Sequence, residues 1–421
     1  MSDRGTMAPA GFDPLRPSVQ QQPYPWYAML RRDAPVCPVP DRGLWFVTSR
    51  SLVVEATERP TLFSSRFGQP QNPPAPDVAQ RVAEIMALGW PRVPTILTED
   101  PPAHTFYRRM AGQAFGPRYV RRWEPHVQAL CAELVDDVIN RATADFVRDF
   151  AVPLPLRVIA RILSVPQDRI GDLHRWSVAV SSPIGAVTEA DVALEQARQT
   201  VEFQHYFAEL LTARKAEPRD DLLSTLVTAP DADRPLTIAE GLSVITQLLV
   251  AGNETTTRLL SGVLLELARN PGHWNWLRED PDARAGLVVE EALRFLSPVQ
   301  GMFRVVTEAT GLGGAILPAG AKVVLCYASA NRDETTFDDA DTFDPTRPDV
   351  ARHLAFGHGA HYCLGAPLAR LEASTALREL ARRVRSITLA ADNDLRYDPS
   401  FLLRGLTRLN LHVVGDDTPL E

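Results

Sequence analysis

The middle of the chain has hydrophobic residues at helical spacing, and the part that follows has them in short runs. From residue 103 to about residue 269 the pattern predicts almost continuous helix, with proline and aspartate turns between the segments. After Pro298 the runs become short and strand-like. The strands expected there are 303–307, 314–317 and 322–326, with a hairpin-like element at 402–414. The predicted fold class is therefore mainly α with a smaller β region.

The N-terminal part gives a mixed pattern. Residues 1–22 are rich in proline, glycine and glutamine, which predicts a weakly ordered tail. The elements expected next are a helix at 26–32, a strand at 43–48, a helix at 51–56 and a proline-rich loop at 68–77. Because no flexible linker divides the remainder, residues 23–421 are expected to fold as a single domain.

Composition and charge narrow the class of protein. Of the 421 residues, 45% are hydrophobic, which is enough for a large core. The formal net charge of -8 offers no broad basic surface for nucleic acid or an anionic membrane. The N-terminus has no signal-peptide run, and no charge-free stretch is long enough to cross a bilayer. We therefore expect a cytoplasmic protein that binds neither nucleic acid nor membrane.

Four cysteines are widely spaced, which argues against a disulfide framework or a structural zinc site. Cys363 differs from Cys37, Cys131 and Cys326 because glycines surround it and a helix is expected to begin directly after it, at about residue 365. The amides and positive dipole at a helix start lower the pKa of a thiol, so a stable thiolate is expected. The alternatives are an inert buried cysteine or a nucleophile that uses a nearby histidine as its base.

The surrounding segment, residues 356–365, reads Phe-Gly-His-Gly-Ala-His-Tyr-Cys-Leu-Gly. Its first two glycines permit positive φ angles and a close approach of the backbone to a flat ligand. The segment matches the pattern Phe-Gly-x-Gly-x-His-x-Cys-x-Gly at every fixed position, and on it the chain resembles the cytochrome P-450 superfamily of bacterial type. The resemblance implies the P-450 fold, with haem b held between a long central helix and the helix after the cysteine.

The resemblance also assigns roles within this segment. Cys363 is the implied axial thiolate ligand of the haem iron, Phe356 packs beside its sulfur, and His361 reaches a haem propionate. Gly365 closes the haem-binding loop. Thiolate ligation pushes electron density towards bound dioxygen and favours cleavage of the O–O bond.

A second motif is Glu291-Ala-Leu-Arg294, in a helix expected from about residue 285 to 295. Residues at i and i+3 share a helical face, so Glu291 and Arg294 can pair. Alone, such a pair is usually a solvated surface bridge. The resemblance implies the Glu-x-x-Arg pair of the family, with Arg347 as the third member of a structural trio that supports the cysteine loop.

The longest expected helix opens with the capping box Thr237-Ile-Ala-Glu240 and ends at Asn270-Pro-Gly. Its middle, residues 251–257, has glycine and three threonines where stronger helix formers would be more stable, so we expect a bulge there. A simple packing notch is the alternative. The resemblance implies the oxygen-activation motif: Ala251 and Gly252 make room beside the iron, Glu254 relays protons, and Thr255 stabilises the iron-bound peroxide.

Residues 100–109, Asp-Pro-Pro-Ala-His-Thr-Phe-Tyr-Arg-Arg, predict a turn that leads into an arginine-rich helix. A solvated charge run is the default interpretation. The resemblance implies that His104 and Arg108 contact haem propionates, as does Arg304 beyond Pro298. The exposed arginines expected to dock an acidic electron-transfer protein are Arg109, Arg118 and Arg122.

The implied activity is hydroxylation, in which one oxygen atom of dioxygen enters a C–H bond and the other leaves as water. Electrons come from NAD(P)H, and because the chain has no flavin or iron–sulfur segment, a ferredoxin and its reductase are expected as separate partners of a monomeric enzyme. The positions expected to line the substrate pocket are Val93, Thr95, Ile96, Gln247, Val250, Ala251, Val299, Met302, Phe303, Leu402 and Leu403.

This set is mostly apolar and indicates a lipophilic substrate such as a steroid, terpenoid, fatty acyl or polyketide compound, with Gln247 as a polar anchor. Met302 and Phe303 are equally consistent with plain core residues. Two other functions stay open: a peroxide-driven haem-thiolate enzyme and a non-enzymatic haem sensor. The Glu254-Thr255 pair counts against both, because neither needs a proton relay to dioxygen.

Overall fold

The computed structural model describes residues 7–39, 42–68, 76–141, 143–181, 189–229 and 234–416. By its internal contacts the chain divides into two compact units. The first unit comprises Met1–Phe67, Trp123–Leu154 and Thr255–Glu421, and the second comprises Gly68–Arg122 and Pro155–Glu254. The expectation of a single domain over 23–421 stays a prediction.

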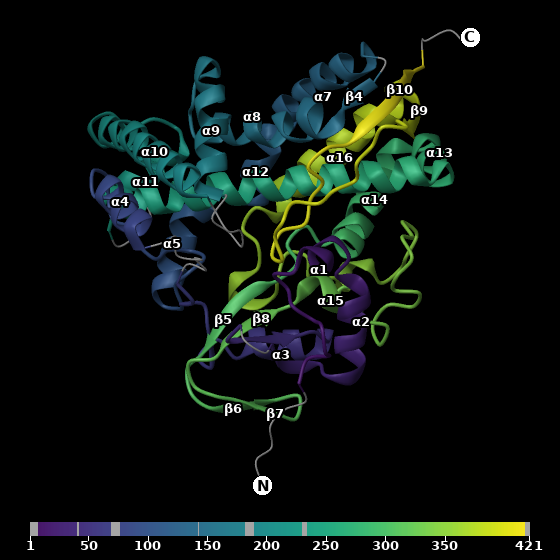
Figure 1. Cartoon of the computed structure of the whole chain (residues 1–421). Helices are drawn as coiled ribbons and strands as arrows, with labels where there is room; N and C mark the ends of the chain where they lie inside the picture. Colours follow the sequence, from purple (N-terminus) through teal and green to yellow (C-terminus); the bar gives the residue numbers. More distant parts are fainter. Residues whose placement is uncertain are drawn as a thin grey trace. The chain divides into compact units, whose positions relative to one another are not determined.

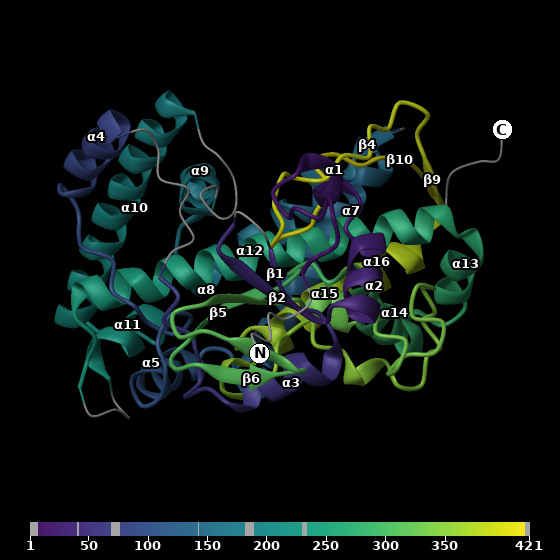
Figure 2. The same cartoon turned by 60° about the horizontal axis from the view of Figure 1, so that its bottom comes forward.

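The first unit contains a five-stranded sheet in the order β1-β2-β8-β5-β3. Its strands are β1 (Val36–Val39), β2 (Leu44–Val47), β3 (Phe63–Ser64), β5 (Met302–Val306) and β8 (Lys322–Leu325). β2 runs parallel to β8 and antiparallel to β1, and β5 runs antiparallel to β8 (Figures 1 and 2). The strands expected at 43–48, 303–307 and 322–326 are thus confirmed. The pattern does not reveal β1, a four-residue strand at the edge of the sheet with Pro38 inside it.

Two smaller sheets complete the β structure of this unit. One has the order β4-β10-β9, with β4 at Thr143–Asp145, β9 at Val384–Leu389 and β10 at Asn410–Gly415. The other pairs β6 (Thr310–Leu312) with β7 (Ala315–Leu317). The hairpin-like element expected at 402–414 is correct only for its last strand, because the partners of β10 lie outside that range. Alternation along a strand indicates which face is buried but not which strand is the neighbour.

The first unit also contains eight helices in its described part. They are α1 (Pro17–Gln21), α2 (Tyr24–Asp33), α3 (Arg50–Glu58), α7 (Glu124–Ile139), α13 (Pro271–Glu279), α14 (Pro281–Leu296), α15 (Tyr327–Ala330) and α16 (Ala366–Arg383). α16 packs against both α7 and α14. The helix expected after the cysteine loop is therefore present, with Pro367 in its first turn.

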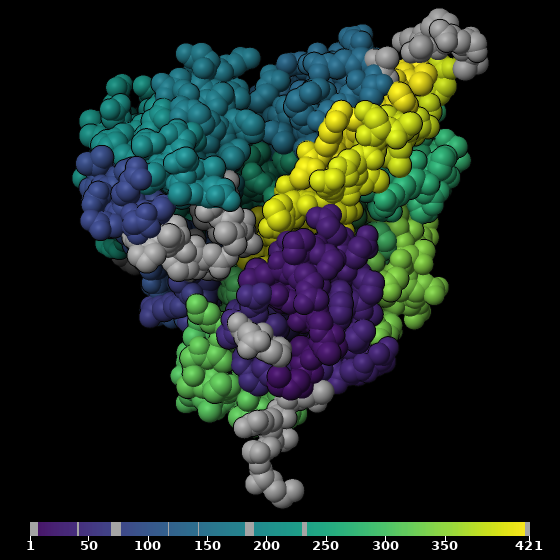
Figure 3. Space-filling model, viewed as in Figure 1, coloured from purple at the N-terminus to yellow at the C-terminus, as the bar shows by residue number. Residues whose placement is uncertain are grey.

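The expected N-terminal tail differs from the structure in its described part, residues 7–22. Phe12 and Val19 are buried, and Val19 lies within α1. The Phe12 ring lies edge-on to Phe46 of β2, with centroids 5.3 Å apart. Figure 3 shows this purple segment against the yellow C-terminal segment, where the Gln21 side chain donates to the Tyr397 carbonyl at 2.8 Å. A few apolar residues with distant partners order a segment whose composition predicts disorder.

The second unit is helical. Its helices are α4 (Pro76–Met86), α5 (Ala103–Gly112), α6 (Pro117–Val120), α9 (Ile170–Ser181), α10 (Ala190–Ala216) and α11 (Leu222–Thr228). α10 packs against α4, α9 and α11, and both views show α4 alongside α10 (Figures 1 and 2). Most of the proline-rich loop expected at 68–77 lies outside the described residues.

Two helices belong to both units, namely α8 (Pro153–Ile162) and α12 (Ile238–Arg269). The expected capping box starts α12: the Glu240 carboxylate accepts from the Thr237 amide at 2.8 Å, and the Glu240 amide donates to the Thr237 hydroxyl at 3.3 Å. Among the helices described, none combines the length and the apolar character needed to span a bilayer.

Candidate functional site

The cysteine loop lies in the first unit, directly before α16. The Cys363 amide donates to the Phe356 carbonyl at 2.8 Å, which closes the loop on itself. Cys363 is the only one of the four cysteines that is not buried. Burial raises the pKa of Cys37 and of Cys326 to about 12 and raises the pKa of Cys131 further. The loop therefore presents one accessible sulfur, whereas the other three thiols are inert.

Two glycines shape this loop as the pattern predicts. Gly357 and Gly359 have φ angles of +72° and +70°, a region that favours glycine. A Cβ at Gly359 would lie 3.2 Å from the Thr57 carbonyl oxygen of α3, and one at Gly357 would lie 3.4 Å from the Tyr327 hydroxyl. The loop thus packs closely on α3 and α15, and side chains at these positions would push it outward.

Two of the residues expected at the haem propionates lie near this loop. His361 Nε2 shares a hydrogen bond of 3.0 Å with the Ser65 hydroxyl. Arg304 on β5 is buried, and its charge acts on Tyr327, although burial is the larger effect and raises the pKa of that phenol. Ser65 is a contact that the sequence does not reveal, because no local pattern connects it with His361.

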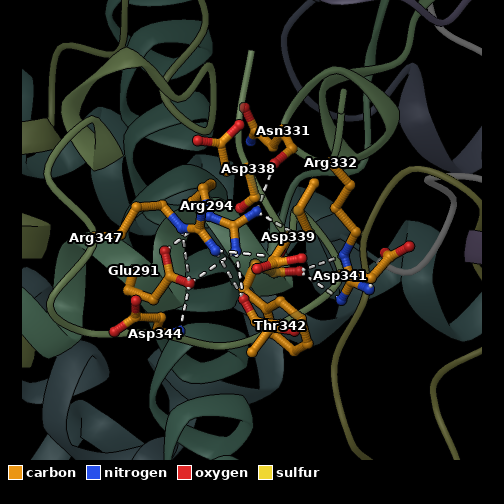
Figure 4. Close-up of polar contacts among 12 residues, drawn as sticks. Glu291, Arg294, Asn331, Arg332, Asp338, Asp339, Asp341, Thr342, Asp344 and Arg347 are labelled. Carbon is orange, nitrogen blue, oxygen red and sulfur yellow. Dashed lines mark hydrogen bonds and ion pairs between the residues drawn. The ribbon is translucent and has the colours of Figure 1, made fainter. Parts of the chain in front are cut away.

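The expected structural trio comes together in the buried part of the first unit (Figure 4). Arg294 donates to both carboxylate oxygens of Glu291 at 2.7 Å, and neither side chain is exposed. Arg347 Nε lies 3.6 Å from the same carboxylate. The two arginines also donate to the main-chain carbonyls of Asn331, Asp338, Asp339, Ala340 and Thr342. The trio therefore fixes the chain between residues 331 and 347.

The middle of α12 carries the expected acid and alcohol, Glu254 and Thr255, as consecutive residues. The expected bulge is wrong, since α12 continues as an α-helix through residues 251–257. The Thr257 hydroxyl donates at 3.0 Å to the Ala151 carbonyl, which ends a π-helical turn at Val147–Ala151. It thus bonds to a neighbouring element instead of competing for the carbonyls of its own helix.

In the second unit, Glu254 is half-buried and accepts a long hydrogen bond of 3.5 Å from the Ser181 hydroxyl of α9. The neighbouring Asn253, which the sequence does not single out, is buried and donates to Ser177 at 3.0 Å. A Cβ at Gly252 would meet Ile159 of α8 at 3.6 Å, an ordinary contact. The glycine is therefore not required by its protein neighbours.

α5 presents two of the expected cofactor-binding residues on one face, because His104 and Arg108 are four residues apart. His104 is buried and Arg108 is half-buried. The arginines expected to dock a partner, Arg109, Arg118 and Arg122, are all exposed. Of these, Arg122 lies 3.8 Å from the exposed Asp220.

The expected pocket residues fall into two local groups. In the first unit, a β-bridge joins Val299 to Leu403, and the Leu402 carbonyl accepts from the Gln300 amide at 2.8 Å. Phe303 and Leu402 are buried, and Met302 is half-buried.

In the second unit, Gln247 donates to the Thr95 hydroxyl at 2.7 Å and accepts from the Leu97 amide at 3.0 Å. This amide therefore fastens the segment around Thr95 to α12, and its expected role as a polar anchor for the substrate stays a prediction. Val93 and Ile96 belong to that segment, and Val93 is held by the Ser243 hydroxyl at 2.9 Å. On α12 itself, Val250 is half-buried and Ala251 is exposed.

These residues suit a haem. A soft sulfur donor stands on a loop with two left-handed glycines, and a buried guanidinium and an imidazole lie nearby. A flat macrocycle with an iron ion and two carboxylates needs this combination of donors.

Comparison with known proteins agrees with this chemistry. The family model of cytochrome P-450 matches residues 187–404. Cytochrome P-450 109 of Bacillus spizizenii is 36% identical over 395 residues, which cover 93% of this chain and 92% of the relative. The 6-deoxyerythronolide B hydroxylase of Saccharopolyspora erythraea is 34% identical and covers 93% and 96%.

A solved structure, CYP109E1 from Bacillus megaterium in complex with testosterone, has a TM-score of 0.81 at 31% identity. The match covers 94% of this chain and 99% of that one. Several relatives of this length and identity, together with the cysteine loop and the trio, lead to one assignment. The chain belongs to the cytochrome P-450 family and is a P-450 monooxygenase.

Proposed function

We propose that this enzyme hydroxylates a lipophilic small molecule with Cys363 as the axial ligand of haem b, using electrons from NAD(P)H through a ferredoxin and its reductase. The observation that carries the proposal is the cysteine loop, with one accessible sulfur among four thiols. When bound, haem supplies the oxidising chemistry and the protein sets its electronics and access.

The residues of the chain have separate tasks. Cys363 binds the iron, while Phe356 and Gly365 shape the loop around its sulfur. His361, Arg304, His104 and Arg108 bind the propionates by charge and hydrogen bonds.

On α12, Glu254 holds and passes a proton, with the Ser181 hydroxyl as a hydrogen-bond donor to it. Thr255, the next residue, positions the group that accepts this proton. Ala251 and Gly252 leave space beside that group. The exposed Arg109, Arg118 and Arg122 attract an acidic electron donor.

The substrate is proposed to be a steroid or a compound similar in size and polarity. The apolar character of Val299, Met302, Phe303, Leu402 and Leu403 supports a lipophilic ligand. The bound testosterone of one related structure and the hydroxylase named among the relatives are consistent with this class. Testosterone and 6-deoxyerythronolide B are therefore the first two probes.

The test has a spectroscopic part and a turnover part. The reduced protein with carbon monoxide should show the red-shifted Soret band of thiolate-ligated haem, and Cys363→Ala should abolish it. Cys37→Ala is the matched control and should keep the band, because that thiol is buried in β1. A histidine-type band in the parent protein would refute the role of Cys363.

For turnover, the enzyme is supplied with a probe and either NADPH, ferredoxin and reductase, or hydrogen peroxide alone. A hydroxylated product with the electron-transfer proteins supports the proposal. Product with peroxide alone would instead identify a peroxide-driven enzyme.

A further inference from the structure

A second arginine–carboxylate cluster lies beside the cysteine loop, one residue before the buried trio in sequence. Glu290 on α14 accepts from Arg370 on α16 at 2.5 and 3.0 Å, and it lies 3.1 Å from His353 Nε2. α14 thus uses Glu291 to hold residues 331–347 and the adjacent Glu290 to hold α16, the helix that begins after the cysteine loop; both helices are labelled in Figure 1.

Arg370 connects this cluster to both ends of the loop. Its guanidinium carbon lies 4.6 Å from the centroid of the Phe356 ring, and its Nη1 donates to the Tyr362 hydroxyl at 3.2 Å. The Phe356 carbonyl accepts from the Cys363 amide, and Tyr362 precedes Cys363 in the chain. The positive charge of Arg370 therefore contacts residues on either side of the sulfur.

The charges in the cluster are balanced. Burial tends to raise the pKa of Glu290, but the hydrogen bonds from His353 and Arg370 outweigh it and lower that pKa to about 2, so Glu290 is ionised. His353 Nδ1 accepts from the Ala355 amide at 3.1 Å, which leaves Nε2 to carry the ring proton. His353 is thus a hydrogen-bond partner of Glu290 through Nε2, and the Glu290–Arg370 pair itself carries one negative and one positive charge.

This pair lies partly out of water. The Glu290 side chain is 22% exposed, Arg370 is 36% exposed and His353 is 3% exposed. Charges held at this depth act on a neighbouring anionic centre more strongly than freely solvated ones. A further polar pair next to the loop, His358 Nε2 and Glu58 at 3.3 Å, is exposed.

We propose that Glu290 and Arg370 are positioning residues that set the electrostatic potential at the cysteine loop, and with it the reduction potential of the haem. The inference rests on Cys363 as haem ligand. Groups outside the direct ligands commonly tune a metal centre through charge and hydrogen bonds. Here the arginine favours the more negative, reduced state, and Glu290 offsets part of that effect.

The experiment measures the haem reduction potential in five proteins besides the parent. They are Glu290→Gln, Arg370→Gln, the double variant, Arg370→Lys and the control Glu202→Gln. Glu202 accepts from Arg175 at 2.7 and 2.9 Å in the second unit, so it is a bidentate pair of the same kind on other elements.

The two single variants both disrupt the Glu290–Arg370 hydrogen bonds but change the charge in opposite directions. Glu290→Gln should raise the reduction potential, and Arg370→Gln should lower it. The double variant should lie closer to the parent than either single variant, and Arg370→Lys, which keeps the charge, should lie closer to the parent than Arg370→Gln. The control should not shift.

A merely structural role gives a different pattern. If both single variants shift the potential in the same direction, or if the double variant deviates most, the inference is refuted. If Arg370→Gln does not retain haem, the reduction potentials of Glu290→Gln and Arg370→Lys test the inference. An absent or downward shift of the reduction potential in Glu290→Gln then refutes the inference. A parent without the thiolate Soret band overturns the proposed function as well, whereas a parent with that band confines the failure to this cluster.

Discussion

Arg294 is one of the two fully enclosed charges of the trio, and Arg294→Met tests what it contributes. Its side chain has no exposed surface and makes five hydrogen bonds, two to Glu291 and three to the carbonyls of Asn331, Ala340 and Thr342. Methionine fills similar space but donates none of them. The Glu291 carboxylate then stays buried with Arg347 and the Asp344 amide as its remaining partners.

Removing one partner of a buried ion pair costs about 3–5 kcal/mol of folding free energy, because the remaining charge stays buried without its main partner. The entropy of unfolding is about 2.1 cal/mol/K per residue, which for 421 residues gives about 0.9 kcal/mol/K. Arg294→Met should therefore lower Tm by about 3–6 °C if the whole chain unfolds together.

The assay is thermal unfolding of the haem-loaded protein, followed by far-ultraviolet circular dichroism. Arg382→Met is the matched control. Arg382 pairs with Asp282 at 2.6 Å, but the two side chains are 42% and 65% exposed. Surface pairs contribute about 0–1 kcal/mol, so the control should lower Tm by about 1 °C or less. Equal shifts in the two variants would refute the argument from burial.

Three further substitutions each test one residue: two buried carboxyl groups and one glycine of the cysteine loop. Burial raises the pKa of Glu372 to about 8, so the protonated form stabilises the fold below about pH 4.5 and this contribution is lost as pH rises through 8. Glu372→Gln should flatten the profile of Tm between pH 5 and 8; an unchanged slope would contradict the buried, protonated state. For Glu240, hydrogen bonds from Arg234 outweigh burial and lower the pKa to about 2, so its contribution is present above about pH 4.5 and is lost as pH falls towards 2. In Glu240→Gln, the acid-induced fall of Tm over that range should be shallower than in the parent, and an equally steep fall would count against the ion pair. Gly359→Ala should reduce haem retention, because it adds a Cβ 3.2 Å from the Thr57 carbonyl. Gly320→Ala carries the same positive-φ strain in open space and should leave haem retention unchanged; equal loss of haem would show that strain alone is responsible.

Features fixed by short-range spacing were predictable from the sequence. Glu291 and Arg294 lie three residues apart in one helix, and the Thr237–Glu240 capping box is equally local. In both cases the backbone geometry alone brings the side chains together. Long-range pairs lack this advantage: Glu290 and Arg370 are 80 residues apart, and no periodicity links them.

Gln247 shows why the hydrogen-bond partner of an expected pocket residue is harder to predict than the position of that residue. An amide on an otherwise apolar helix face requires a hydrogen-bond partner, and the sequence is equally consistent with a substrate and with another part of the protein. In the structure, one of its N–H groups donates to the Thr95 hydroxyl and its oxygen accepts from the Leu97 amide. Each half of the amide can make a second hydrogen bond, so a substrate that bonds to Gln247 would meet an amide whose orientation is fixed by these two contacts. Specificity at this position therefore depends on how firmly that segment is held, so a change at Thr95 should alter substrate preference even though Thr95 is fully buried.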